Sequence, residues 1–137
     1  MEARTFDHAA DIGVLGEGRT VEEAFVGAAR AMFSVMVDLD GVRPLQSVEI
    51  ACTASDRELL LVQWLNALLA EADMRGMVFC DFAVRLLDGG LAGTARGERW
   101  DLERHVPGVE VKGATLTALE VARGADGTWR AQTVVDV

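Results

Sequence analysis

Two carboxylates and an imidazole lie within seven residues near the N-terminus, in the run Asp7-His8-Ala9-Ala10-Asp11-Ile12-Gly13. At the other end of the chain, a strand-like run of hydrophobic residues finishes in Asp136 and the terminal carboxylate of Val137. Carboxylate oxygens are the ligands that hard cations such as magnesium, calcium and manganese prefer. If the two ends of the chain meet, they bring together donors for such a cation.

The same residues also have ordinary structural explanations. Asp11 could cap a turn, and Asp136 could be a solvated residue at a terminus, and the residue types alone favour these explanations. His8 could stabilise the turn by hydrogen bonding, or it could bind a ligand or transfer a proton. Neither histidine has a partner at zinc-ligand spacing, and no nucleophile motif is present. Sequence motifs therefore do not indicate an enzyme.

Charge narrows the class of partner. The chain carries 13 Lys and Arg against 22 Asp and Glu, a formal charge of -9, which disfavours direct binding of RNA or DNA and favours cations or a basic protein surface. Lys112 is the single lysine in the sequence.

No apolar run approaches the roughly 18 residues that a membrane span needs, and the N-terminus does not resemble a signal peptide. Two cysteines, Cys52 and Cys80, form no disulfide framework, so we expect a cytoplasmic protein with buried, reduced thiols.

The elements that must position these residues are predicted by capping and periodicity. Thr20 to Glu23 is a capping box, and the helix that it begins is expected to end at residues 38–41, with Gly41 in the left-handed conformation. A strand is predicted at 47–53, followed by a second capping box at 55–58. The helix that follows is apolar enough to predict a packing role for Trp64.

Period-two patterns dominate the second half of the chain. Strands at 78–87 and 91–98 with a turn at 88–90 predict a hairpin, and the charged loop at 97–107 is expected to form surface ion pairs. Further strands are predicted at 109–112, 114–123 and 128–135. The expected fold is a single α+β domain over residues 1–137, with a mainly antiparallel β-sheet and two packed helices.

The sequence also resembles the archease family across essentially its whole length. The matching features occur in the family's order: the run from Asp7 to Gly13, the capping box leading into Ala24-Phe25, the Leu60 to Leu69 helix around Trp64-Leu65-Asn66, Gly97-Glu98, Glu110-Val111-Lys112 with Thr115, and the final Asp136-Val137. The resemblance implies a small accessory protein that is not itself an enzyme. Its partner would be an RtcB-type RNA ligase, which joins RNA 3'-phosphate or 2',3'-cyclic phosphate ends to 5'-hydroxyls through a guanylylated histidine.

The resemblance implies that the accessory protein promotes metal- and GTP-dependent guanylylation of the ligase, and its multiple turnover, in tRNA splicing and RNA repair. The resemblance implies a divalent-metal site at Asp11, Asp136 and Val137, holding calcium, magnesium or manganese. It implies partner activation by Lys112, with His8 and Glu98 as further candidates. Two alternatives stay open: a metal-dependent hydrolase and a general chaperone-like binding module.

Overall fold

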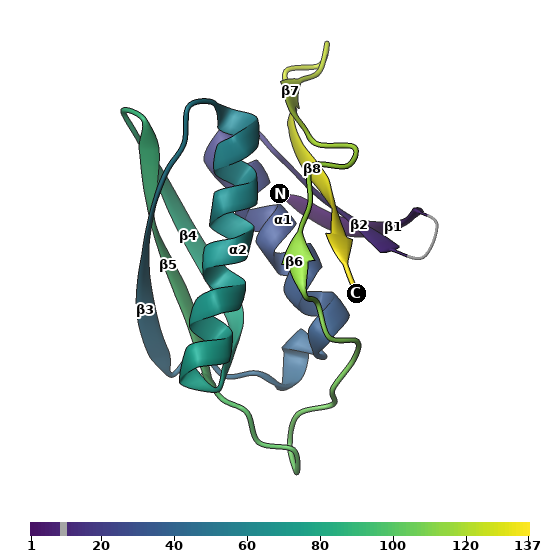
Figure 1. Cartoon of the computed structure of the whole chain (residues 1–137), viewed down its shortest axis with the longest axis vertical. Helices are drawn as coiled ribbons and strands as arrows, with labels where there is room; N and C mark the ends of the chain where they lie inside the picture. The colour runs from purple at the N-terminus through teal and green to yellow at the C-terminus, as the bar shows by residue number, and fades with distance from the viewer. Residues whose placement is uncertain (9–10) are drawn as a thin grey trace.

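The computed structural model describes the backbone of residues 1–8 and 11–137, and the side chains of residues 1–6 and 11–137 (Figure 1). Residues 9 and 10, inside the predicted turn, lie outside the described residues. The elements in chain order are β1 (Glu2–His8), β2 (Asp11–Gly18), α1 (Val21–Met36), a short 3-10 helix (Leu39–Gly41), β3 (Gln46–Thr53), α2 (Arg57–Arg75), β4 (Met77–Leu87), β5 (Gly90–Arg99), β6 (Gly113–Ala114), β7 (Glu120–Arg123) and β8 (Trp129–Asp136).

The strands form two sheets. One has five strands, in the order β1-β2-β8-β6 with β7 also paired to β8, and the other has three, in the order β3-β5-β4. Every strand pair within the described residues is antiparallel. The predicted α+β architecture, with a mainly antiparallel sheet and two helices, is confirmed, and the antiparallel strands are divided between two sheets.

Helix α1 packs against both sheets, contacting β2, β1 and β8 of the larger one and β4 of the smaller one (Figure 1). Its approach to β2 is close at Gly16, where a Cβ atom would lie 2.0 Å from the Ala24 carbonyl oxygen. Glycine is therefore required on this face of the strand, because any side chain would push the helix away. The opposite face of β2 points away from α1.

Helix α1 begins as predicted but ends differently. The Thr20 hydroxyl accepts a hydrogen bond from the Glu23 N–H at 3.1 Å, as expected of an N-cap. The prediction that Gly41 ends the helix is wrong, because α1 stops at Met36 and Gly41 belongs to the 3-10 helix without a positive φ. The N–H groups of Gly108 and Val109 donate to the carbonyls of Met36 and Val35, so a distant segment caps the helix.

Helix α2 begins one residue later than the predicted capping box implies. Asp56, rather than Ser55, is the N-cap and accepts from the Leu59 N–H at 2.8 Å. The helix ends at Gly76, whose φ of 61° is left-handed. Trp64 is fully buried and donates through Nε1 to the Phe25 carbonyl at 3.1 Å, which confirms its packing role.

The hairpin of β4 and β5 is confirmed, while two predictions for the last third are wrong. Residues 109–112 form no strand, and the predicted strand at 114–123 is divided into β6 and β7. Between them, Ala118 has a φ of 55°, which is incompatible with a continuous strand. Cys80 is buried, Cys52 is half-buried, and both are free thiols. Among the described residues, no helix is both long and apolar enough to cross a membrane.

Candidate functional site

The pairing of β2 with β8 brings the beginning and the end of the chain to one end of the larger sheet. Ile12 pairs with Val135, so the next step of the same register places Asp11 opposite Asp136. Opposed residues of an antiparallel pair direct their side chains to the same face. Asp11 is half-buried and Asp136 is exposed. The two aspartates therefore share one face and one end of the sheet.

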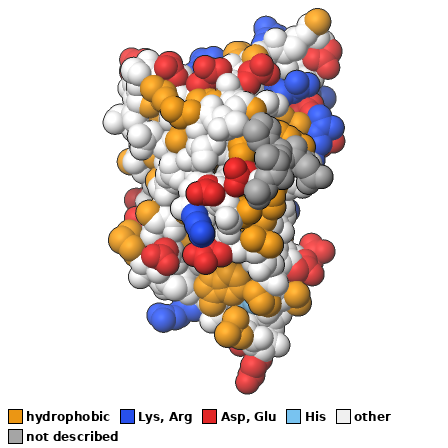
Figure 2. All heavy atoms as spheres, turned by 45° about the vertical axis from the view of Figure 1, so that its right-hand side comes forward, with side chains coloured by type: hydrophobic (Ala, Val, Ile, Leu, Met, Phe, Trp, Pro, Cys, Tyr) orange, Lys and Arg blue, Asp and Glu red, His pale blue; other side chains and the backbone are white. Residues whose placement is uncertain are grey.

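Lys112 reaches the same end through the main chain. Gly113 in β6 pairs with Asp136, and the Lys112 N–H donates to the Asp136 carbonyl at 2.7 Å. The Lys112 side chain is exposed. Figure 2 shows Asp and Glu side chains gathered around a Lys or Arg side chain near the middle of the face that it draws.

Asn66, on α2, positions β6. Its side-chain oxygen accepts from the Ala114 N–H at 2.8 Å, and its side-chain nitrogen lies 3.5 Å from the Ala114 carbonyl oxygen, as a donor. The Asn66 amide thereby faces the main-chain N–H and carbonyl of β6 as a neighbouring strand would, and it holds the segment that carries Lys112. No contact was predicted for Asn66 from the sequence, although an amide within the strongly apolar Leu60 to Leu69 helix is a signal that could have indicated a main-chain partner.

The terminal carboxylate belongs to Val137. Its side chain is partly buried against the hydrophobic core, one residue beyond the end of β8. We refer to Asp11, Asp136, Val137 and Lys112 together as the terminal cluster. No ion pair joins the side chains of Asp11, Asp136 or Lys112 to any other group in the described part of the chain.

The chemistry of the cluster can be compared with what a metal ion requires. Among residues with described side chains, no three or more His, Cys, Asp or Glu groups lie together as a metal site would need. The candidate donors are instead two aspartate side chains and the main-chain carboxylate of Val137. This all-oxygen set fits calcium, magnesium or manganese and does not fit zinc.

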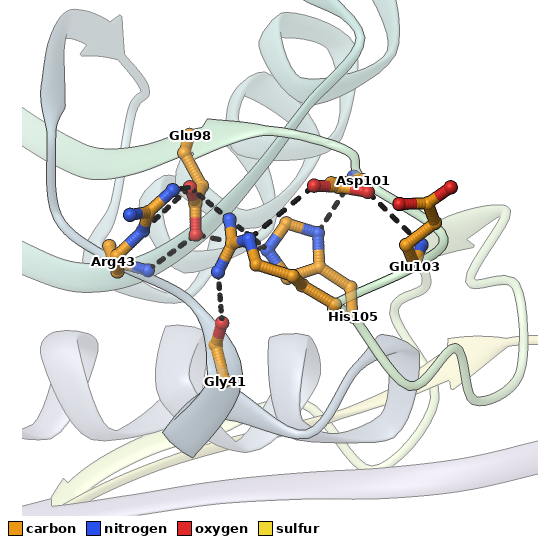
Figure 3. A network of polar contacts seen from close by, with 7 residues as sticks. Gly41, Arg43, Glu98, Asp101, Glu103 and His105 are labelled. Atoms are coloured by element: carbon orange, nitrogen blue, oxygen red, sulfur yellow. Dashed lines mark hydrogen bonds and ion pairs between the residues drawn. The ribbon is translucent and has the colours of Figure 1, made fainter.

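Glu98 is placed elsewhere, in a buried network at the end of β5 (Figure 3). Its Oε1 accepts from Arg43 Nε at 3.2 Å and from Arg104 Nη2, while its Oε2 accepts from the Arg43 N–H at 2.7 Å and contacts His105 Nε2 at 3.0 Å. The hydrogen bond from Arg104, supported by those from Arg43 and His105, holds the pKa of Glu98 far below its ordinary range. The expectation of only surface ion pairs in this loop is therefore wrong for Glu98 and for His105, which is also buried.

The ring of His105 fixes the start of the loop after β5. Its Nδ1 accepts from the Asp101 N–H at 2.9 Å, so in the neutral ring Nε2 carries the hydrogen and donates to Glu98. Trp100 packs edge-on against the same ring, with centroids 5.8 Å apart. Within the described residues, the side-chain partners of Glu98 are Arg43, Arg104 and His105, and none of them belongs to the terminal cluster. His8 pairs with Asp11 through the main chain in β1 and β2, and its side chain lies outside the described residues.

A groove adjoins the terminal cluster. It has a volume of about 620 Å³ and lies between α2, the end of α1 and residues 107–112. Met36, Leu69, Met77 and Trp100 contribute apolar lining, and Asp73, Glu110 and Lys112 contribute charge. This groove was not predicted from the sequence. The feature of the sequence that could have indicated the groove is the hydrophobic pair Val109 and Val111. In the structure, their segment forms no strand.

Comparison with known proteins covers nearly the whole chain. The model of the Archease protein family (MTH1598/TM1083) matches residues 4–137. Protein archease of Pyrococcus furiosus is 40% identical over 136 residues, and that of Thermococcus gammatolerans is 42% identical over 136, with 96% of each chain covered in both cases. The solution structure of Methanobacterium thermoautotrophicum protein 1598 superposes with a TM-score of 0.83 at 35% identity and 98% coverage of both chains. A crystal structure from Thermotoga maritima, named an archease and possible chaperone, superposes with a TM-score of 0.62 at 19% identity. The match covers 96% of this chain and 94% of the Thermotoga maritima chain, and it supports the fold alone.

Proposed function

The chain belongs to the archease family, and from that premise we propose that it is a metal-binding accessory protein of an RtcB-type RNA ligase. It promotes the GTP-dependent guanylylation of the ligase histidine and its multiple turnover, in tRNA splicing and RNA repair. It acts in the cytoplasm, and it has no catalytic residues of its own.

One observation supports this proposal above the others, namely the convergence of Asp11, Asp136 and the Lys112 segment at one end of the larger sheet. Within the described residues, the side chains of Asp11 and Asp136 form no ion pair, and these two carboxylates and a terminal carboxylate repel one another unless a cation or a basic group lies between them. A partly exposed cluster of this kind is suited to binding a divalent cation and presenting it to a partner.

The residues have separate tasks in the proposed mechanism. Asp11, Asp136 and the carboxylate of Val137 would hold the cation, which would supply positive charge to offset that of the ligase-bound nucleotide. Lys112, an exposed residue directly before β6, adds a second positive charge, and the hydrogen bond that the Ala114 N–H donates to the Asn66 side-chain oxygen keeps its segment in place. His8 and Glu98 are proposed to assist activation of the partner, and the buried position of Glu98 favours an indirect contribution through the loop at 99–105.

The acidic charge supports contact with a protein over contact with RNA. A net charge of -9 repels a polyanion and steers the chain towards the basic, RNA-binding face of a ligase. We propose that the chain binds the ligase and makes no direct contact with nucleic acid.

A guanylylation assay tests the proposal. Catalytic amounts of this chain, added to the ligase encoded in the same genome with GTP and a divalent cation, are expected to increase the amount of ligase–GMP and the number of ligation turnovers. Asp11→Asn is expected to abolish the stimulation, whereas Asp88→Asn, in the exposed hairpin turn, should leave it unchanged. An unchanged ligase would overturn the proposal. Metal-dependent hydrolysis by the chain alone would favour the hydrolase alternative, and protection of unrelated proteins would favour the chaperone-like one.

A further inference from the structure

The groove next to the terminal cluster has the properties of a docking surface. It has about 620 Å³ of volume, within the range that receives several side chains. Val109 on its wall is 50% exposed, and Figure 2 shows hydrophobic side chains gathered directly below the acidic and basic ones. Exposed apolar surface of this kind, bordered by charge, is typical of a protein contact.

The charges of the groove specify what fits there. Asp73 and Glu110 are exposed, and neither forms an ion pair in the described part of the chain. Against these two carboxylates stands the one ammonium group of Lys112. The groove is therefore acidic within an acidic molecule, which disfavours an anionic ligand, an RNA or a second copy of this chain.

The main chain along the groove is also available. Gly108 and Val109 use their N–H groups to cap α1, and Lys112 uses its own to bind Asp136. Among the hydrogen bonds of the described residues, none uses the N–H groups of Glu110 or Val111. Because Val111 is buried and Glu110 is exposed, the N–H of Glu110 is the donor left for a carbonyl oxygen of an extended peptide.

We propose that this groove receives an extended segment of the ligase, in which an apolar side chain lies beside an arginine or lysine. The apolar side chain packs on the lining formed by Val109 and Trp100, and the basic one pairs with Asp73 or Glu110. Lys112 belongs both to the groove and to the terminal cluster. A ligase segment bound in the groove therefore holds the terminal cluster next to the ligase. The inference rests on the proposed function for the identity of the partner.

Reversal of the groove charges tests the inference. The double variant Asp73→Arg and Glu110→Arg is compared with Glu49→Arg and Asp88→Arg, which changes the net charge equally at exposed sites outside the groove. Affinity for the ligase is measured calorimetrically at low and high salt. The natural chain is expected to bind more weakly as salt rises, and the groove variant at least about tenfold more weakly at low salt, with a flatter salt dependence. The control variant should bind with an affinity much closer to that of the natural chain.

A third variant separates the apolar contribution from the charge. Val109→Ser keeps the main-chain bond to Val35 and is expected to weaken binding severalfold without changing the salt dependence. Thermal unfolding of each variant shows that the fold is retained.

The outcomes distinguish the two proposals. Groove variants that bind as tightly as the natural chain overturn the docking site while leaving the accessory function in place. A natural chain that binds through the groove but never stimulates guanylylation overturns the function alone, and a natural chain that does not bind the ligase overturns both. If light scattering instead detects a dimer that the groove variant dissociates, a second copy occupies the groove and the inference is wrong.

Discussion

The main-chain N–H of Lys112 donates a hydrogen bond to the main-chain carbonyl of Asp136 at 2.7 Å. This bond joins the segment that carries the single lysine to the last residue of β8. Because it involves main-chain atoms only, the placement of the segment does not depend on the lysine side chain. Variants of Lys112 can therefore test its charge separately from the fold.

Lys112→Ala is expected to reduce stimulation of ligase guanylylation by at least about tenfold while leaving the unfolding temperature nearly unchanged. The reason is that the variant removes the exposed ammonium group and keeps the hydrogen bond to Asp136. Initial rates of ligase–GMP formation give the measurement. Lys112→Arg serves as the control, since it retains the positive charge and should keep part of the stimulation. Full stimulation by the alanine variant would remove Lys112 from the site.

A short extension after Val137 is expected to abolish stimulation and to weaken binding of manganese or calcium at least about tenfold. A peptide bond in place of the terminal carboxylate removes one oxygen donor with its charge, while the Val137 side chain can stay packed on the core. Titration calorimetry with each cation gives the affinity. An extension of equal length before Met1, which is 59% exposed, is the matched control. Unchanged metal affinity in the extended chain contradicts the assignment of the terminal carboxylate.

Glu98→Gln is expected to lower the free energy of unfolding at neutral pH by about 1.5 to 3 kcal/mol, because it removes the buried carboxylate that accepts charge-assisted hydrogen bonds from Arg43 and Arg104. Urea unfolding followed by far-ultraviolet circular dichroism measures the change. Asp81→Asn is the control, since its ion pair with Arg96 is exposed on both sides and should contribute less than about 1 kcal/mol. Equal losses in the two variants would mean that the buried network adds no stability beyond a surface pair.

The contribution of Glu98 to the free energy of unfolding should decrease as the pH is lowered. Its pKa in the folded chain lies below the ordinary value of 4.5, so its contribution is fully present above that value and is lost as pH falls towards the folded pKa. The difference in unfolding free energy between the natural chain and Glu98→Gln should therefore be largest near neutral pH and shrink below about pH 4.5. Unfolding curves at several pH values measure it. A difference that stays constant down to about pH 3 contradicts the lowered pKa.

Gly16→Ala is expected to destabilise the fold by about 1 to 3 kcal/mol. The added Cβ would lie 2.0 Å from the Ala24 carbonyl oxygen and 2.3 Å from the Ala28 nitrogen, so α1 must move away from β2. Gly41→Ala is the control, because its nearest neighbour, the Arg104 carbonyl oxygen, lies 3.6 Å away and its φ is not positive. Chemical denaturation compares the two variants, and similar stabilities would contradict close packing at Gly16.

Local sequence signals predicted the elements that depend on neighbouring residues. Thr20 begins α1 because its hydroxyl needs only the amide of Glu23, three residues away. Gly89, with a φ of 71°, forms the hairpin turn between two alternating strands, as the sequence indicated. In the candidate site, Asp11 and Asp136 could be chosen as candidate donors by their side chains and by the resemblance.

Long-range pairing determined the parts that were missed. Helix α1 ends at Met36 because Gly108 and Val109, about seventy residues further along the chain, bind its last carbonyls. The same interaction holds residues 107–109 against α1, so they form no strand of either sheet, and it shapes one wall of the groove. Burial of Glu98 likewise depends on Arg43, which lies 55 residues away in the sequence.

The sequence by itself determined the antiparallel α+β architecture, the start of α1, the start of α2 to within one residue and the chemistry of the two chain ends, because capping and alternation act over a few residues. Only the tertiary structure decided that β2 and β8 are neighbours in a register that places Asp11 opposite Asp136, and that Glu98 lies in a separate buried network. It also decided that a groove opens beside Lys112. The physical reason is that register, burial and cavities arise from contacts between residues far apart in the chain, which no local pattern encodes.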